Sequence, residues 1–231
     1  MIKNKSILAI TLARGGSKGI PKKNITPLNG KPLLEYTIEE VKKSKYIDHY
    51  VVGTDSKDIK LVCEKNNTNV LNREYVKDTQ TTAEGLLEIL EQLPQYDYVI
   101  EIMCTNPFKT VEDIDSVIEK LSNSNGESVT SVTRIWDNHP SRVKFISNGI
   151  LTGFNPEEDP DKPGWRRQDL SPAAYVRNGS LYAMTYNQIV NKKKRLTPQT
   201  QAYIMEENRS INIDEPIDLL IAEHLIRNEN K

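Results

Sequence analysis

The amino-acid sequence predicts an α/β fold in which a mostly parallel sheet is flanked by helices. Short apolar runs typical of buried strands alternate with segments whose apolar residues recur at helical spacing. Two alternating runs joined by Asn-Gly add a small β-hairpin projection. The chain of 231 residues, 37% hydrophobic and 27% charged, has the length and composition of one globular domain over residues 1–231.

Strands and helices alternate in the first half of the chain. The expected elements are a strand over residues 7–10, a helix over 33–43, a strand over 50–53, a helix over 57–65, a strand over 69–71 and a helix over 86–93. Pro32 follows an Asn-Gly turn and can start the first helix, because proline is well tolerated in a first turn. Thr81 or Thr82 can cap the last of these helices.

The second half is expected to complete the sheet and add the hairpin. The expected elements are a strand over residues 98–103, a helix over 111–121, a strand over 128–132, hairpin strands over 142–147 and 150–154, a short helix before 192 and a helix over 217–226. Asn148-Gly149 suits a type I′ turn, which needs positive φ at both central residues. Residues 155–164 are expected to form a loop, and the charge run over 192–195 is expected on a solvated face.

The loop after the first strand, LARGGSKGIPKKN over residues 12–24, combines three glycines with one arginine and three lysines. Glycines let backbone N–H groups approach a ligand, and the cations supply charge-assisted hydrogen bonds. This composition indicates a polyphosphate site. The glycine spacing does not fit the dinucleotide fingerprint, and Ser17 precedes Lys18 where a P-loop needs the reverse order. A flexible basic loop without a ligand is the alternative.

Composition excludes several other classes of function. The formal net charge is −1, so no global positive field favours nucleic acid. No apolar run is long enough to cross a membrane. Cys63 and Cys104 are far apart and form no CxxC pair, which favours two buried thiols in a reducing cytoplasm over a zinc site or a disulfide.

The motif LARGGSKGIPKKN closely resembles the N-terminal motif of the CMP-sialic acid synthetases, also called acylneuraminate cytidylyltransferases. These enzymes have a Rossmann-like nucleotidyltransferase fold, join CTP to a nine-carbon 2-keto sugar acid and release pyrophosphate. The resemblance implies catalytic roles for Arg14, Lys18, Lys23 and Asp214. The residues that it implies for nucleotide binding are Ala13, Arg14, Gly15, Gly16, Ser17, Lys18, Lys23, Asn24, Thr81 and Thr82.

The acceptor site is implied by three further segments that resemble the family: the turn over residues 103–109, Arg167-Gln168-Asp169-Leu170 and Arg177-Asn178-Gly179. The family's Gln-Pro-Thr-Ser-Pro-Leu-Arg turn corresponds to residues 103–109 here, where Met103 replaces the glutamine. The missing amide favours an acceptor other than ordinary N-acetylneuraminate, such as a legionaminic- or pseudaminic-type sugar. The residues implied in sugar binding are Met103, Thr105, Asn106, Arg167, Gln168, Arg177 and Asn178. Arginine suits a sugar carboxylate because its planar fork donates two parallel hydrogen bonds; surface arginines without a ligand are the alternative.

A magnesium site is implied where the family has Asp-Ile-Asp and this chain has Asn212-Ile213-Asp214. Magnesium commonly uses one or two carboxylates plus substrate phosphates, so Asp214 alone suffices, with Asn212 as a weak ligand. Asp55, at the end of the second strand, can supply another acid or can act only at the start of the following helix. The alternative for Asp214 is a helix N-cap ahead of Pro216.

The resemblance also implies a homodimer, in which residues 140–170 form a hairpin and loop subdomain that meets a second subunit. Packing of the hairpin on its own domain is the alternative, because an isolated hairpin is marginally stable. Two other functions remain open. One is a nucleotidyltransferase that uses GTP or CTP with another sugar or sugar phosphate, and the other is a nucleotide- or sugar-binding protein without catalysis.

Overall fold

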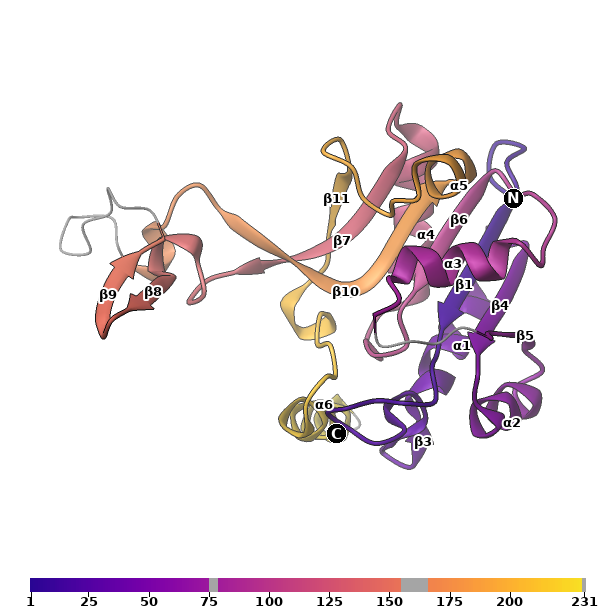
Figure 1. Ribbon diagram of the computed structural model, residues 1–231, viewed down its shortest axis with the longest axis horizontal. Helices are drawn as coiled ribbons and strands as arrows, with labels where there is room; N and C mark the ends of the chain where they lie inside the picture. The colour runs from indigo at the N-terminus through magenta and orange to yellow at the C-terminus, as the bar shows by residue number, and fades with distance from the viewer. Residues whose placement is uncertain (75–78, 155–165, 230–231) are drawn as a thin grey trace.

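A computed structural model describes residues 1–74, 79–154 and 166–229, and its centre is a seven-stranded sheet (Figure 1). The strands are β1 (Ile7–Leu12), β4 (His49–Thr54), β5 (Asn69–Asn72), β6 (Tyr98–Ile102), β7 (Ser128–Ile135), β10 (Ala174–Thr185) and β11 (Gln201–Ile204). Their order is β11-β7-β10-β6-β1-β4-β5. Strand β10 is antiparallel to both of its neighbours, and the other neighbouring pairs are parallel. The prediction of a mostly parallel sheet is confirmed.

Helices cover both faces of the sheet. They are α1 (Leu33–Lys43), α2 (Lys57–Lys65), α3 (Thr82–Leu90), α4 (Val111–Asn123), α5 (Tyr186–Lys192) and α6 (Pro216–Glu229). Alternate residues of β1 show the two layers: Leu8 and Ile10 pack with α3 and α5, whereas Ile7 and Ala9 pack with α4. A strand buried on both faces must be apolar throughout, which is why the first apolar run shows no polar alternation.

Helix α3 begins four residues earlier than the sequence pattern predicted. Thr81 is its N-cap: the hydroxyl accepts a hydrogen bond from the backbone N–H of Glu84 at 3.2 Å. The Glu84 carboxylate accepts in return from the backbone N–H of Thr81 at 2.7 Å. This reciprocal capping box satisfies two N–H groups that a helix start otherwise leaves unpaired, so the helix starts at Thr82. Apolar periodicity alone had placed the start at residue 86.

A two-stranded arm extends from the sheet and carries the predicted hairpin (Figure 1). The far ends of β7 and β10 pair with each other up to Ile135 and Ala174, and they lead to β8 (Lys144–Ser147) and β9 (Ile150–Gly153). Asn148 and Gly149 have φ values of 51° and 78°, as the predicted type I′ turn requires. The hairpin lies away from its own domain, so the alternative of packing back is wrong. The loop expected over residues 155–164 lies outside the described residues.

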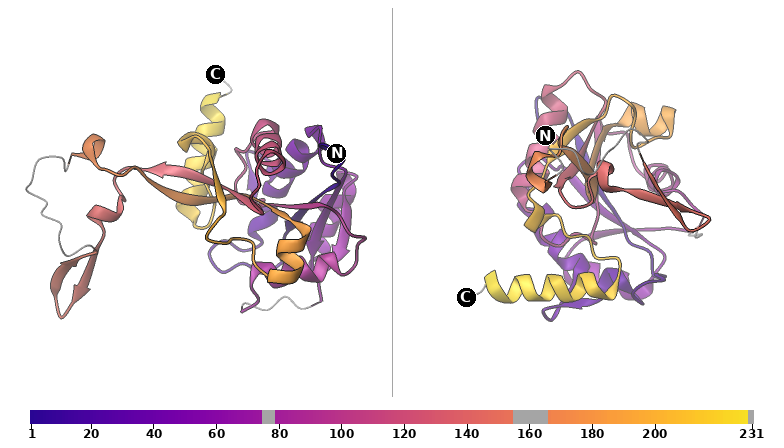
Figure 2. Two further views of the ribbon diagram at one scale, coloured as in Figure 1. Left: turned by 90° about the horizontal axis from the view of Figure 1, so that it is seen from above. Right: turned by 90° about the vertical axis from the view of Figure 1, so that its left-hand side faces the viewer.

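Helix α6 is the last element of the described chain and directly follows the segment over residues 212–215 (Figure 2). It starts at Pro216, one residue before the predicted start, and its buried residues Ala222 and Ile226 pack with Leu28 and with Leu33, the first residue of α1. In the described residues, no helix has both the length and the apolar character needed to span a bilayer.

Both cysteines are buried and free, as the sequence predicted. Burial raises the pKa of the Cys63 thiol to about 12 and that of the Cys104 thiol to about 11. Both thiols therefore stay protonated at neutral pH, which excludes a thiolate nucleophile at either position.

Candidate active site

A cavity of about 600 Å³ opens at the carboxyl ends of β1 and β6. Leu12 closes β1, Met103 directly follows β6, and Arg73 directly follows β5; all three line the cavity. This is the edge at which parallel α/β sheets bind ligands, because the loops that leave the strands diverge there. The loop over residues 12–24 forms one wall, and the segment over 212–215 forms the wall beside it.

Gly15 and Gly19 allow the loop over residues 12–24 to pack closely against Ser56 and Asp214. The backbone N–H of Gly15 donates to Asp55 Oδ1 at 2.8 Å, and a Cβ on Gly15 would lie 2.9 Å from Ser56 Cβ. A Cβ on Gly19 would lie 2.5 Å from the carbonyl oxygen of Asp214, which is closer than any real Cβ contact. Asp55 therefore anchors the loop. Ser56, and not Asp55, occupies the N-cap position of α2. That Asp55 supplies another acid for the metal stays a prediction.

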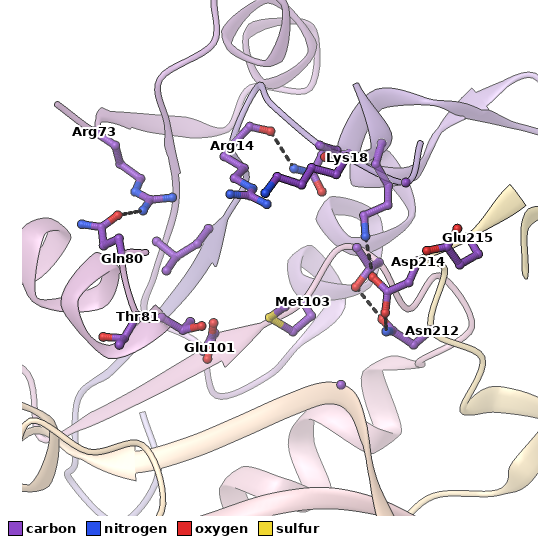
Figure 3. A pocket seen from close by; sticks show the side chains of 18 residues that line it. Arg14, Lys18, Arg73, Gln80, Thr81, Glu101, Met103, Asn212, Asp214 and Glu215 are labelled. Carbon is purple, nitrogen blue, oxygen red and sulfur yellow. Dashed lines mark hydrogen bonds and ion pairs between the residues drawn. The ribbon is translucent and has the colours of Figure 1, made fainter. Parts of the chain in front are cut away.

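The loop residues divide into structural and cavity-facing groups. Ala13 is fully buried, and Asn24 donates from Nδ2 to the carbonyl oxygen of Arg14 at 2.9 Å. Arg14 and Lys18 extend their side chains side by side into the cavity (Figure 3). Lys22 turns away and pairs with Asp58 at 2.6 Å. The predicted residues that line the cavity are Arg14, Ser17, Lys18, Lys23, Asn24, Thr81 and Thr82, whereas Ala13, Gly15 and Gly16 are not among its lining residues.

Asp214 faces the cations across the cavity. Its Oδ1 lies 2.5 Å from Lys23 Nζ, and its Oδ2 accepts a hydrogen bond from the side-chain amide of Asn212. The Thr105 hydroxyl donates to Asn212 Oδ1 at 2.6 Å, which turns the nitrogen of that amide toward Asp214. The backbone N–H groups of Asp214 and Glu215 donate to Asp218 Oδ2. Asp218 thus caps α6, and the N-cap alternative for Asp214 is wrong.

The residues at this end fit a magnesium ion that is shared with a substrate. Within residues 1–74, 79–154 and 166–229, no three His, Cys, Asp or Glu side chains are grouped to hold a metal by themselves. Asp214 is 59% exposed and lines the cavity with Glu215, so one or two carboxylates are available to complete a site with phosphates and water. Asn212 Oδ1 accepts from Thr105 and its amide nitrogen donates to Asp214, so the amide supports the carboxylate of Asp214. A metal contact through the remaining lone pair of Oδ1 stays a prediction.

The other end of the cavity contains two charged residues that the sequence did not single out. Arg73 is 8% exposed, and its Nη2 donates to Gln80 Oε1 at 2.6 Å (Figure 3). Glu101 is fully buried beside it; burial raises the pKa of its carboxyl, and Arg195 opposes that rise. A lone acid inside an apolar strand was the available signal for Glu101. For Arg73, the signal was its position directly after a strand.

The turn over residues 103–109 is held from behind by a buried lysine. Lys109 is 1% exposed and donates from Nζ to the carbonyl oxygens of Met103 and Asn106 and to the Thr37 hydroxyl. Burial lowers the pKa of Lys109 to about 7. Asn106 is fully buried by this arrangement, so its predicted contact with a sugar needs correction. Met103 and Thr105 do line the cavity.

A second cavity of about 420 Å³ adjoins the first and shares Gly179 and Asn212 with it. The pairing of β10 with β7 is irregular between Arg177 and Tyr182, and Gly179 has a φ of 64°. This bulge places Arg177 and Asn178 on the cavity wall. The Asn178 amide also bonds the hydroxyls of Ser131 and Ser210, which fixes its orientation.

Arg167 and Gln168 do not reach either cavity within one chain. They lie in a short 3₁₀ turn, Arg167–Asp169, on the arm. The Arg167 guanidinium is 5.5 Å from the centre of the Trp136 ring and 3.6 Å from Asp137 Oδ2. The predicted sugar-binding set is thus divided, with Met103, Thr105, Arg177 and Asn178 at the cavities.

Sequence and structure comparisons both find similarity to enzymes named as cytidylyltransferases or CMP-sugar synthases. The model of the family described as Cytidylyltransferase matches residues 8–147. A CMP-N,N'-diacetyllegionaminic acid synthase of Legionella pneumophila is 32% identical over 229 residues, which cover 95% of this chain and 96% of that protein. An N-acylneuraminate cytidylyltransferase of Streptococcus agalactiae serotype V is 28% identical over 92% of this chain, which spans 51% of that longer protein. The structure of a CMP:2-keto-3-deoxy-manno-octonic acid synthetase complexed with CTP is 15% identical, covers 97% of this chain and 99% of its own, and gives a TM-score of 0.74.

Proposed function

Because the chain belongs to the cytidylyltransferase family, we propose that it transfers CMP from CTP to a 2-keto-3-deoxy nonulosonic acid and releases pyrophosphate. The relatives named for legionaminic and acylneuraminic acids support this acceptor class. The observation that carries the proposal is a cavity with Arg14, Lys18 and Lys23 at one end, which adjoins a second cavity lined by arginines. The first cavity suits a nucleoside triphosphate, and the second suits a sugar acid.

The reaction forms a bond between the anomeric oxygen of the sugar and the α-phosphorus of CTP. The bond between the α-phosphorus and the oxygen that bridges to the β-phosphate breaks, and pyrophosphate leaves with that oxygen. The proton of the anomeric hydroxyl passes to solvent. Arg14 and Lys18 neutralise charge on the phosphates and hold them for in-line attack.

Magnesium is the proposed cofactor, and Asp214 is the residue that would hold it, together with the phosphates of CTP. When bound, the ion would neutralise phosphate charge and lower the pKa of the attacking hydroxyl. Lys23 and Asn212 both bond Asp214 and so fix its carboxylate toward the cavity. These two contacts also prevent the carboxylate from rotating away as the phosphates arrive.

The acceptor that we favour is of the legionaminic type. Met103 directly follows β6 and lines the first cavity, at the place where the turn of the CMP-sialic acid synthetases has a glutamine. A thioether cannot donate the hydrogen bonds of an amide. The side chain of Met103 offers apolar contact in place of those bonds. A substituent without a hydrogen-bonding demand at that point therefore fits this chain better.

A homodimer is the proposed active unit. The hairpin exposes five large apolar side chains by 54–74%, namely Phe145, Ile146, Ile150, Leu151 and Phe154. Such a patch marks a surface that a partner covers. Arg167 and Gln168 lie on the same arm, distant from the cavities of their own chain, so a two-fold partner can receive them. We place the reaction in the cytoplasm, which the two free buried thiols support.

The proposal is tested with purified protein, Mg²⁺, each nucleoside triphosphate in turn and a panel of nonulosonic acids and sugar phosphates. Pyrophosphate release should require CTP and a sugar acid together. Turnover with GTP or with a sugar phosphate would support the other nucleotidyltransferase function. Binding of CTP by calorimetry without any turnover would instead indicate a binding protein.

A further inference from the structure

Arg195 is half-buried beside the first cavity although the sequence places it in a charge run. The run over residues 192–195 was expected on a solvated face, and that expectation is wrong for Arg195. Its side chain is 20% exposed, and its Nη1 donates to Oε2 of the fully buried Glu101 at 2.7 Å. Lys193 and Lys194, its neighbours in the run, are exposed.

The surrounding residues fix Arg195 in place from several sides. Helix α5 ends at Lys192, and Lys193 adopts a left-handed conformation with φ of 52° that turns the chain back. The buried amide of Gln188 then donates to the carbonyl oxygen of Arg195 at 2.9 Å. The guanidinium lies 4.3 Å from the centre of the Tyr182 ring, and Tyr182 is the cross-strand partner of Glu101. The ion pair and the ring contact restrain the side chain, and the Gln188 bond holds its backbone.

Arg195 lines the second cavity and has more N–H donors than Glu101 uses. A guanidinium carries five N–H donors, and in the described part of the chain Glu101 is the polar group that accepts from it. Arg177 lines the same cavity, and no described carboxylate pairs with it. Among the described residues that line this cavity, these two arginines are the charged ones and none is acidic. The cavity is therefore electropositive and presents planar donors to an anion.

We propose that Arg195 binds the carboxylate of the acceptor together with Arg177, and that Glu101 is a positioning residue that orients Arg195. The inference rests on the proposed function, because it assigns a contact to the acceptor of that reaction. Glu101 lines the first cavity and Arg195 lines the second, so one ion pair forms part of the wall between the two substrates.

The test compares kinetic constants for Arg195→Met with those of the parent enzyme. The KM for the sugar acid should rise on the order of 10- to 100-fold, the effect of losing one charge-assisted contact, whereas the KM for CTP stays within about threefold. The methyl ester of the same acid is the second probe. The parent should prefer the acid to the ester by a similar factor, and Arg195→Met should lose most of that preference. Lys194→Met, in the same run, is the matched control and should change neither constant.

Two further variants separate binding from folding. Glu101→Leu combined with Arg195→Leu removes both charges and leaves no unpaired buried carboxylate, so the thermal midpoint should hold while the preference for the acid is lost. Glu101→Gln keeps a hydrogen bond to Arg195 but frees its orientation, and it should raise the KM for the acid more than it lowers kcat. Retained preference for the acid in folded Arg195→Met would overturn the proposal. A parent enzyme that turns over no sugar acid would instead refute the proposed function.

Discussion

The replacement of Asp214 by asparagine distinguishes a metal-binding carboxylate from a structural one. Asp214 is 59% exposed, so the loss of its ion pair with Lys23 should cost less than about 1 kcal/mol of stability. The loss of a ligand charge is a larger effect. If a charge-assisted contact contributes about 1.5–3 kcal/mol, the Mg²⁺ concentration that gives half-maximal activity should rise by about 10- to 150-fold.

The assay is pyrophosphate release at saturating CTP and acceptor, measured as a function of Mg²⁺ concentration. Asp218→Asn is the matched control, because Asp218 accepts hydrogen bonds from the backbone N–H groups of Asp214 and Glu215 and lies nearby on α6 without lining the cavity. It should lower the free energy of unfolding by about 1 kcal/mol, as loss of a cap does, without a shift in the Mg²⁺ titration. An unchanged titration in Asp214→Asn would refute the assignment of the metal site to this carboxylate.

Three further predictions concern the loop, the buried lysine and the hairpin. Gly19→Ala should weaken CTP binding, measured by calorimetry, at least about tenfold, because the added Cβ would lie 2.5 Å from the carbonyl oxygen of Asp214. Gly16→Ala is the control, because a Cβ there would have nothing within 4 Å. Equal effects of the two variants on CTP binding would contradict this role of Gly19. The pKa of Lys109 is lowered to about 7, so between pH 7 and 9 the unfolded chain binds a proton that the folded chain has released. The free energy of unfolding of the parent, relative to that of Lys109→Met, should therefore rise by up to about 2 kcal/mol from pH 7 to pH 9 when both are measured by urea unfolding. If this difference in free energy is the same at both pH values, Lys109 stays charged in the folded chain. Leu151→Asp should convert the dimer to a monomer in analytical ultracentrifugation, whereas a monomeric parent would contradict the proposed dimer.

Local chemistry was enough to predict the fold and to find residues that line the first cavity. The composition of the loop over residues 12–24 and the Asn148-Gly149 turn both give signals within a few consecutive residues, and the structure places the loop at the cavity and the turn in the hairpin. Asp214, chosen by its place in a short motif, lies at the same cavity, and its role as a metal ligand stays a prediction. In each case the residues that matter are neighbours in the chain.

Long-range pairing explains what the sequence did not predict. Arg195 and Glu101 are 94 positions apart, and only the register of β10 on β6 brings Tyr182 beneath the guanidinium. Without that register, the residue is one cation in a run of four. Asn106 was predicted at the site but is buried, because the buried Lys109 donates to its carbonyl oxygen and holds the turn against the domain.

The measurement that tests the central claim most directly is the mass of the product formed from CTP and a nonulosonic acid. The account predicts a species whose mass equals CMP plus the acid minus water, formed in equal amount with pyrophosphate. It also predicts that Arg14→Ala, at the triphosphate end of the cavity, abolishes most of this product. Release of phosphate or CMP without a linked sugar, across the whole panel of acids, would contradict the claim that the two adjoining cavities join two substrates.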